Sequence, residues 1–306
     1  MTVYFSIFLV LLTLATGIIW AIDHFVWKPK RNDKITALES QTGTPFTDDQ
    51  KDQAAPQSSI AEFAQAAFPI LAFVLIMRSF IYEPFRIPSG SMMPTLLEGD
   101  FILVEKFRYG LRDPVWRNEF IETGRPERGD IAVFKYPEEP DVDYIKRVVG
   151  LPGDRVIYRE KKVYVQPAQC EAPCEEPEIL VAEREMLSQG EFFKDRYPLT
   201  RYREALDGRE HDILINHASR PHLGIYARQD GTRDDEWIVP EGHYFMLGDN
   251  RDNSIDSRFW GFVHEDLLVG RATFIWMSFE FDRDRNSWMP DWVPSKVRFD
   301  RLGGIE

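Results

Sequence analysis

The sequence predicts a mainly β protein: an antiparallel β-sheet domain with an inserted β-rich subdomain, preceded by two N-terminal transmembrane helices. Two long apolar segments near the N-terminus indicate the helices. After residue 83, short β-branched and aromatic runs alternate with Gly, Pro and Asp, as in residues 131–134, 144–149 and 244–247. This spacing favours antiparallel strands over alternating βαβ units.

The first apolar segment covers residues 3–22, which are twenty residues without a charge. A helix of that length crosses the hydrocarbon core of a bilayer. The alternative is a secretory signal peptide, but the segment has no charged leading region and no small-residue cleavage site before Asp23. Trp20 and Trp27 suit the aromatic belt of a membrane interface. We therefore expect a transmembrane helix within residues 1–27.

The second apolar segment, residues 63–77, is shorter and contains Gln65 and Pro69. Taken alone, it also fits a buried or an interfacial helix. Extension to Ile81 gives a spanning length, with Arg78 able to reach the interface along its aliphatic stem. We expect a second transmembrane helix over residues 60–82.

The polar stretch between the two helices, residues 28–59, has few large apolar residues and is expected to be a mobile loop. Its basic residues gather directly after the first helix: Lys28, Lys30, Arg31 and Lys34. The positive-inside rule places this loop in the cytoplasm. Everything after Tyr82 then faces outward, which is the periplasm in a bacterium with an outer membrane.

Residues 83–158 and 237–306 carry the regular strand pattern and are expected to form the main β domain. Residues 159–236 are richer in charge and less regularly patterned, so they are interpreted as an inserted lesser domain. The net charge of −13, spread along the chain, argues against a nucleic-acid partner, because phosphate binding requires a clustered basic surface.

The chain has two cysteines, Cys170 and Cys174, in a stretch rich in Pro and Glu. Two thiolates make a poor structural zinc site, since four ligands are usual. In an oxidising compartment the pair is a candidate disulfide, with two free thiols as the alternative.

A serine-rich turn follows the second apolar segment, with the sequence PSGSMMPTL at residues 88–96. Gly90 permits backbone angles that other residues resist, and the flanking prolines restrict the chain. Such a turn can hold one hydroxyl as a nucleophile and direct another, with a backbone amide, at an oxyanion. The alternative is that Ser and Gly are simply turn formers.

A serine nucleophile needs a base. His243 and His264 remain candidates for a Ser-His-Asp triad, but neither stands in a recognisable signature. Lys146 is the stronger candidate, because its predicted strand places it among apolar neighbours. Desolvation there would make the neutral amine accessible near neutral pH. Without the serine turn, a strand lysine would be read as a solvated surface residue.

The third motif is GDNRDNSIDSR at residues 248–258. Its Asp and Asn residues resemble a calcium loop, but Ser257 and Val263 occupy the positions of the required glycine and glutamate, so no metal site is predicted. A polar turn that orders other residues is the better interpretation. Within it, Ser254 could hydrogen-bond the neutral lysine, and Asp256 could pair with Arg258.

The combination of motifs resembles a known family, the bacterial type I signal peptidases or leader peptidases, which are Ser-Lys dyad proteases. The resemblance rests on PSGSMMPTL, GDIAVFKYP, YIKRVVGLPGD and GDNRDNSIDSR, which follow two N-terminal apolar segments in the family's order. With the closing GRATFIWMSF run, it covers nearly the whole chain.

The resemblance implies Ser91 as nucleophile and Lys146 as general base, with the Ser89 hydroxyl and Ser91 amide forming the oxyanion hole. The residues implied to support this site are Ser254, Asp256 and Arg258. The residues implied to form the pockets for small substrate side chains are Ile87, Met92, Leu96, Tyr144 and Ile145. No metal or organic cofactor is implied, so EDTA should leave activity unchanged.

The implied function is a serine endopeptidase of the bacterial inner membrane that removes signal peptides from exported preproteins after a small residue. Its expected partners are signal peptides, membrane lipid and, transiently, the secretion machinery. The apolar run 274–279 could touch lipid or form a core strand. One alternative is a Ser-Lys protease of other specificity, such as a self-cleaving repressor, although no DNA-binding head is found. The other is a non-enzymatic membrane-tethered β scaffold, in which the serines and the lysine are structural.

Overall fold

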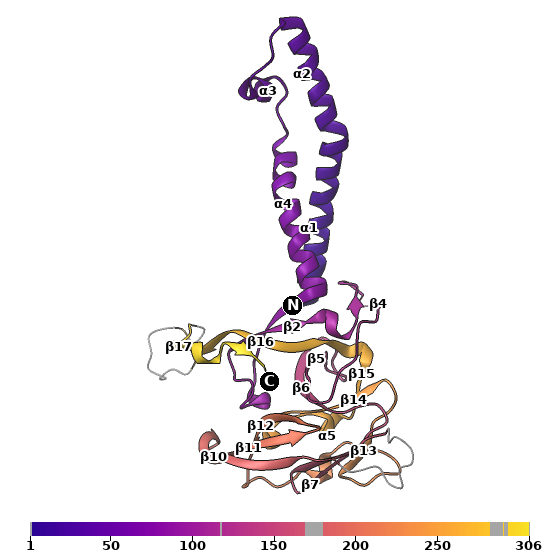
Figure 1. Ribbon diagram of the computed structural model, residues 1–306, viewed down its shortest axis with the longest axis vertical. Helices are drawn as coiled ribbons and strands as arrows, with labels where there is room; N and C mark the ends of the chain where they lie inside the picture. The colour runs from indigo at the N-terminus through magenta and orange to yellow at the C-terminus, as the bar shows by residue number, and fades with distance from the viewer. Residues whose placement is uncertain (1, 117, 169–179, 282–289, 291–292, 306) are drawn as a thin grey trace. The chain divides into compact units, whose positions relative to one another are not determined.

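The computed structural model describes residues 2–116, 118–168, 180–281, 290 and 293–305 (Figure 1). The chain divides into two compact units, Met1–Ile81 with Arg112–Asn118, and Tyr82–Leu111 with Glu119–Glu306. The two cysteines lie outside the described residues, so the disulfide prediction stays a prediction.

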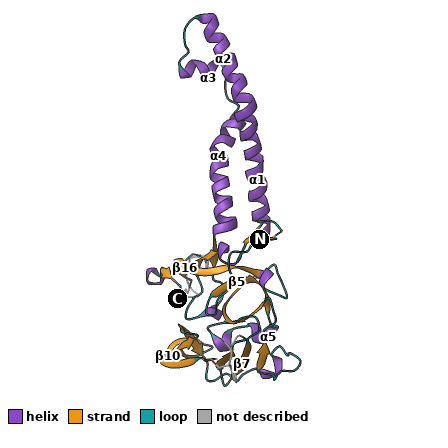
Figure 2. Cartoon of the chain, turned by 45° about the vertical axis from the view of Figure 1, so that its right-hand side comes forward, coloured by secondary structure: helices purple, strands orange, loops and turns teal. Residues whose placement is uncertain are grey.

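The N-terminal unit is helical, as Figure 2 shows. Its helices are α1 (Thr2–Ile22), α2 (Lys28–Thr42), α3 (Asp48–Ala54) and α4 (Ser59–Ile76). Helices α1 and α4 lie side by side and expose large apolar side chains such as Phe8, Leu14, Phe63 and Phe73. By length and composition, Phe5–Thr42 and Ser59–Ile81 can each cross a membrane. The apolar exterior fits lipid, as the two predicted spans require.

The stretch predicted as a mobile loop, residues 28–59, differs from expectation because it contains α2 and α3. Gly43, with φ of 69°, ends α2 in the left-handed conformation that glycine adopts without strain. A capping box between Thr47 and Gln50 begins α3. Neither helix buries a residue. The polar composition therefore predicted the lack of a core correctly, but local capping forms helices without one.

The second unit contains a nine-stranded sheet with the order β1-β2-β16-β5-β6-β14-β15, to which β17 and β18 add by pairing with β16. The recorded pairings are antiparallel, which confirms the predicted fold class. The strands are β1 (Tyr82–Arg86), β2 (Asp100–Glu105), β5 (Ile131–Lys135), β6 (Asp143–Gly150), β14 (His243–Leu247), β15 (Val263–His264), β16 (Leu268–Glu280), β17 (Lys296–Val297) and β18 (Gly303–Gly304).

Two smaller sheets have the orders β13-β7-β8-β9 and β10-β11-β12. Their strands are β7 (Arg155–Arg159), β8 (Lys162–Gln166), β9 (Leu180–Val181), β10 (Glu183–Lys194), β11 (Tyr197–Leu206), β12 (Arg209–Ile215) and β13 (Glu236–Ile238). Two further strands, β3 (Leu111–Arg112) and β4 (Glu119–Ile121), pair with each other, and α5 (Ser257–Trp260) is a short α-helix. The predicted borders of the inserted region, near residues 159 and 236, fall inside the first of these sheets, because β7 pairs with both β8 and β13. Among the described residues of that region, only β10, β11 and β12 form a sheet of their own.

Strand β6 carries residues toward both faces of the large sheet, as its alternation predicted. Ile145 packs against the cluster around Ile87, Met92 and Leu96. Tyr144 packs instead with Phe134 and Val148. Lys146 follows Ile145 on this strand, and its side chain is 4% exposed. The fold thus buries a lysine in the middle of its sheet.

Candidate active site

The serine turn follows β1 and is held by apolar anchors. Residues Gly90–Met92 form one turn of 3-10 helix. The side chains of Ile87, Met92 and Leu96 are buried in one apolar cluster, and Ile87 exchanges backbone hydrogen bonds with Gly99 and Asp100. Because these buried side chains lie before and after Ser91 in the sequence, they hold the turn that carries the serine in a fixed position.

Lys146 meets this serine. Its Nζ donates to Ser91 Oγ over 2.8 Å and to the Ile145 carbonyl over 2.9 Å. Burial lowers the pKa of Lys146 to about 8, although the carboxylates of Asp256 and Asp249 oppose part of that shift. About a tenth of the amine is then neutral at pH 7, far more than for a solvated lysine. The arrangement can transfer the serine proton to nitrogen.

Ser89 lies on the same turn, and its hydroxyl is 3.5 Å from Ser91 Oγ. The two histidines considered as alternative bases lie elsewhere in the fold. His243 and His264 oppose each other on β14 and β15, with ring centroids 4.8 Å apart. The described side-chain hydrogen bonds of Ser91 involve Lys146 and Ser89, and neither histidine takes part in them.

The turn 248–258 supports the serine through its backbone. The backbone amide of Asn250 donates to the Ser91 carbonyl over 3.0 Å, and the side-chain Nδ2 of Asn250 donates to the Gly90 carbonyl over 3.0 Å. Gly248 is required here, because a Cβ at that position would lie 2.7 Å from the Ser91 carbonyl oxygen. Sequence reasoning did not assign a role to Asn250, since no local pattern indicates which backbone a side-chain amide will bind.

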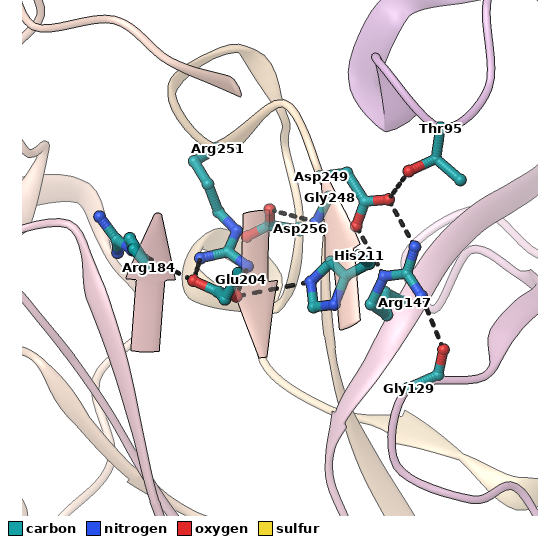
Figure 3. Close-up of polar contacts among 10 residues, drawn as sticks. All are labelled: Thr95, Gly129, Arg147, Arg184, Glu204, His211, Gly248, Asp249, Arg251 and Asp256. Atoms are coloured by element: carbon teal, nitrogen blue, oxygen red, sulfur yellow. Dashed lines mark hydrogen bonds and ion pairs between the residues drawn. The ribbon is translucent and has the colours of Figure 1, made fainter. Parts of the chain in front are cut away.

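Arg147, adjacent to Lys146, is also buried, but it binds a carboxylate. Its Nε and Nη2 donate to Asp249 over 2.8 and 2.7 Å, and Thr95 Oγ1 donates to the same carboxylate over 2.5 Å (Figure 3). This cluster joins β6, the serine turn and the turn 248–258. Sequence reasoning missed it too, although an arginine within a buried strand is itself a signal that a carboxylate partner is needed.

The predicted pair of Asp256 and Arg258 is formed, with Arg258 Nε and Nη2 donating over 2.7 and 2.8 Å. Asp256 also accepts the Gly248 amide over 3.0 Å, and so orders the start of the turn. Ser254 is buried nearby, but its hydroxyl forms no hydrogen bond with a described protein atom. The expected bond from Ser254 to Lys146 is therefore not formed in this structure.

The five predicted pocket residues divide between two clusters. Ile87, Met92 and Leu96 are buried together and Ile145 packs against them, whereas Tyr144 belongs to the cluster on the other side of β6. The Tyr144 ring lies 5.4 Å from Lys146 Nζ and stacks on Tyr136 at 4.4 Å. Apolar side chains thus flank the lysine on two sides, and the pocket role of all five stays a prediction.

An antiparallel β fold in which a buried lysine amine contacts the hydroxyl of a turn serine is that of a serine hydrolase. The comparisons with known proteins narrow this class. Residues 60–277 match the family described as signal peptidase, peptidase S26. Signal peptidase I from Haemophilus influenzae is 38% identical, over 97% of this chain and 90% of the relative. Signal peptidase I from Pseudomonas aeruginosa is 41% identical over the full length of both chains. The chain therefore belongs to the signal peptidase family, peptidase S26, which confirms the predicted resemblance.

Among solved structures, a signal peptidase I from Enterococcus faecalis V583 is 26% identical and covers 48% of this chain and 96% of that one, with a TM-score of 0.26.

Proposed function

We propose that this chain is a membrane-anchored serine endopeptidase that removes N-terminal signal peptides from exported preproteins, cutting after a small residue. The observation that carries the mechanism is the 2.8 Å contact between Lys146 Nζ and Ser91 Oγ, made by an amine whose pKa burial lowers to about 8. Membership of the signal peptidase family supports the substrate class. Nothing among these findings favours a non-enzymatic scaffold.

In the proposed reaction, the neutral Lys146 amine takes the proton of Ser91 as the serine oxygen attacks the scissile carbonyl carbon. The Ser89 hydroxyl and the Ser91 amide donate to the oxyanion of the tetrahedral intermediate. Protonated Lys146 then gives its proton to the leaving amine, which leaves an ester on Ser91. Lys146 next takes a proton from water, whose oxygen attacks the ester. As the bond to the Ser91 oxygen breaks, Lys146 returns the proton to that oxygen, and the signal peptide leaves with a free carboxylate.

Specificity for a small residue is proposed to come from apolar side chains that leave little space beside the reacting atoms. The residues proposed for this role are Ile87, Met92, Leu96, Tyr144 and Ile145. Their supports are the burial of the first three and the packing of Ile145 against them. Asp256 and Arg258 are proposed to order the supporting turn, and Ser254 to orient the lysine amine during the reaction.

The enzyme is proposed to lie in the bacterial inner membrane, with residues 28–59 in the cytoplasm and residues 83–158 and 237–306 forming the periplasmic catalytic domain around the insertion 159–236. The basic residues that follow the first span support this orientation. Ser91 follows Ile81, the end of the second span, by ten residues, which favours chemistry close to lipid and to the secretion machinery.

Cleavage of an exported preprotein by the purified full-length chain in detergent tests this proposal. We expect the wild type to release the signal peptide at one bond, identified by mass spectrometry of both products. Ser91→Ala and Lys146→Ala should abolish cleavage. Lys162→Ala is the matched control, because Lys162 is an exposed lysine of strand β8.

Undiminished cleavage by the Ser91→Ala variant would refute the proposed nucleophile. Cleavage of the preprotein only within its mature part would instead support a Ser-Lys protease of another specificity.

A further inference from the structure

A buried carboxylate of the inserted region contacts the turn that supports the serine. Glu204, on β11, has 0% exposure and binds Arg251 of the turn 248–258 (Figure 3). Arg251 Nη1 donates to Glu204 Oε2 over 2.9 Å, while Arg251 Nη2 pairs with the other carboxylate oxygen. Arg184 of β10 and His211 of β12 approach the same carboxylate, at 3.3 and 3.5 Å. The carboxylate of one glutamate in the sheet β10-β11-β12 thus contacts three basic side chains.

Burying such an ion pair costs desolvation free energy, and removing one of its partners destabilises the fold strongly. Burial alone raises the pKa of Glu204, but the Arg251 guanidinium and its hydrogen bonds lower that pKa to well below its usual range. The carboxylate therefore stays ionised inside the protein. Removing the carboxylate would leave the Arg251 guanidinium buried without its carboxylate partner. Well-packed apolar side chains at this position could stabilise the fold equally well, so stability alone does not account for this ion pair.

The same inserted region holds the turn at two further points. The Leu214 amide donates to the Asp249 carbonyl over 2.9 Å, and the Asn216 amide donates to Asp252 Oδ2 over 2.8 Å. Lys161 Nζ, from the hairpin between β7 and β8, donates to Asp252 Oδ1 over 2.9 Å. Residues 249–252 are thus fixed from one side by strands β11 and β12 and by this hairpin.

From its other side, the turn fixes the nucleophile's backbone. Asn250, the residue before Arg251, binds the carbonyls of both Gly90 and Ser91 over 3.0 Å. A continuous set of contacts therefore leads from Glu204 through Arg251 and Asn250 to Ser91. Because the contact between Ser91 Oγ and Lys146 Nζ is only 2.8 Å long, a shift of the turn by about an ångström would disrupt it.

We propose that the inserted sheet β10-β11-β12 sets the position of the reacting serine, with Glu204 as a positioning residue that acts through Arg251 and Asn250. This inference rests on the proposed function of Ser91. It assigns a positioning role in the reaction to Glu204, a residue of the region whose sequence is least regular.

The test compares Glu204→Gln with Arg203→Gln in the full-length enzyme, measured by preprotein cleavage in detergent. Arg203 is the neighbour of Glu204 on β11, but its side chain is 46% exposed and pairs with Asp212 on the outer face. We expect Glu204→Gln to lower kcat by about 10- to 100-fold with KM changed by less than about twofold, because the geometry of attack is lost and binding is kept. Arg203→Gln should stay within about twofold of the wild type in both constants. Equal kcat values for the two variants would overturn the inference.

A double-mutant cycle with Asn250→Ala separates positioning from general destabilisation. If Glu204 acts through the turn, the double variant should be no more than about threefold slower than the slower single variant. Fully multiplicative losses would show that Glu204 does not act through the Asn250 side chain and its bond to Gly90, and would also overturn the inference.

If Glu204→Gln does not fold, as judged by thermal unfolding, Lys161→Met tests the inference instead. This variant removes the ion pair between Lys161 and Asp252 of the same turn. It should lower kcat at least about threefold at unchanged KM. An unchanged kcat in that variant would count against the inference. The wild type reports separately on the proposed function, because its failure to cleave any preprotein would refute that function rather than the role of Glu204.

Discussion

The buried cations around the candidate active site fall into two groups with opposite chemistry. In the turn 248–258 and at its border, each of three buried guanidinium groups has a carboxylate partner: Arg147 with Asp249, Arg251 with Glu204, and Arg258 with Asp256. Beside them, the Lys146 amine forms an ion pair with no described residue within 4.0 Å and contacts a hydroxyl and a carbonyl instead. A guanidinium group stays charged in proteins, so its burial requires a carboxylate partner, whereas the buried amine without such a partner can become neutral. The difference separates cations that build the site from the one that reacts.

Replacing the Lys146 amine with a permanently charged group is expected to have the largest effect, on catalysis. Lys146→Arg keeps the positive charge but cannot supply a neutral base, because guanidinium does not deprotonate in proteins. We expect kcat/KM for preprotein cleavage to fall about 10³-fold. Lys162→Arg, at the exposed position on β8, should leave kcat/KM unchanged. Substantial activity in Lys146→Arg would show that this residue is not the base.

Removing the partner of a paired cation should have a different effect, on folding. Asp256→Asn leaves Arg258 buried without its carboxylate, and we expect the free energy of unfolding to fall by about 3 to 5 kcal/mol. Chemical denaturation of the detergent-solubilised enzyme measures it. Arg203→Gln, which breaks a half-exposed pair, should cost less than about 1 kcal/mol. Equal losses in the two variants would contradict the distinction between the buried and the exposed pair.

The pH dependence sharpens the comparison further. Because the pKa of Lys146 is lowered to about 8, the amine is neutral above that pH and becomes protonated as the pH falls through it. Protonation removes the base, so kcat/KM should decrease about tenfold per pH unit below pH 8. A pH series of initial cleavage rates tests this. A rate that stays constant down to pH 6 would show that another group accepts the serine proton.

The smallest effect is expected from a neutral member of the paired region. Thr95→Val removes the hydroxyl that donates to Asp249 but leaves both Arg147 contacts in place. We expect the free energy of unfolding to decrease by about 1.5 kcal/mol, which is at the lower end for loss of one hydrogen bond to a charged group. A decrease above 3 kcal/mol would show that Thr95, rather than Arg147, carries most of the stabilisation of that carboxylate.

Much of the fold could be predicted because its signals are local. Twenty uncharged residues indicate a span, and alternation along residues 144–149 placed Lys146 within a strand whose two faces pack differently. The helices α2 and α3 were missed because composition shows that a segment lacks a core but not that caps such as Gly43 will hold it helical.

The candidate site was predictable only in part. Ser91 and Lys146 were identified by the conjunction of motifs, and the structure brings their side chains into contact. The partners of Arg147 and Arg251 lie 102 and 47 residues away along the chain, so no local pattern could name them. Ser254 shows the opposite case, since it lies in the expected turn without the expected hydrogen bond.

The hydrogen bonds from Asn250 fix the serine turn through the main-chain carbonyls of Gly90 and Ser91 and do not involve the Ser91 hydroxyl. Loss of that hydroxyl therefore removes the reaction without removing the shape that receives the polypeptide. A chain carrying Ser91→Ala should act as a trap, retaining intact precursors long enough for them to be isolated with the enzyme and identified.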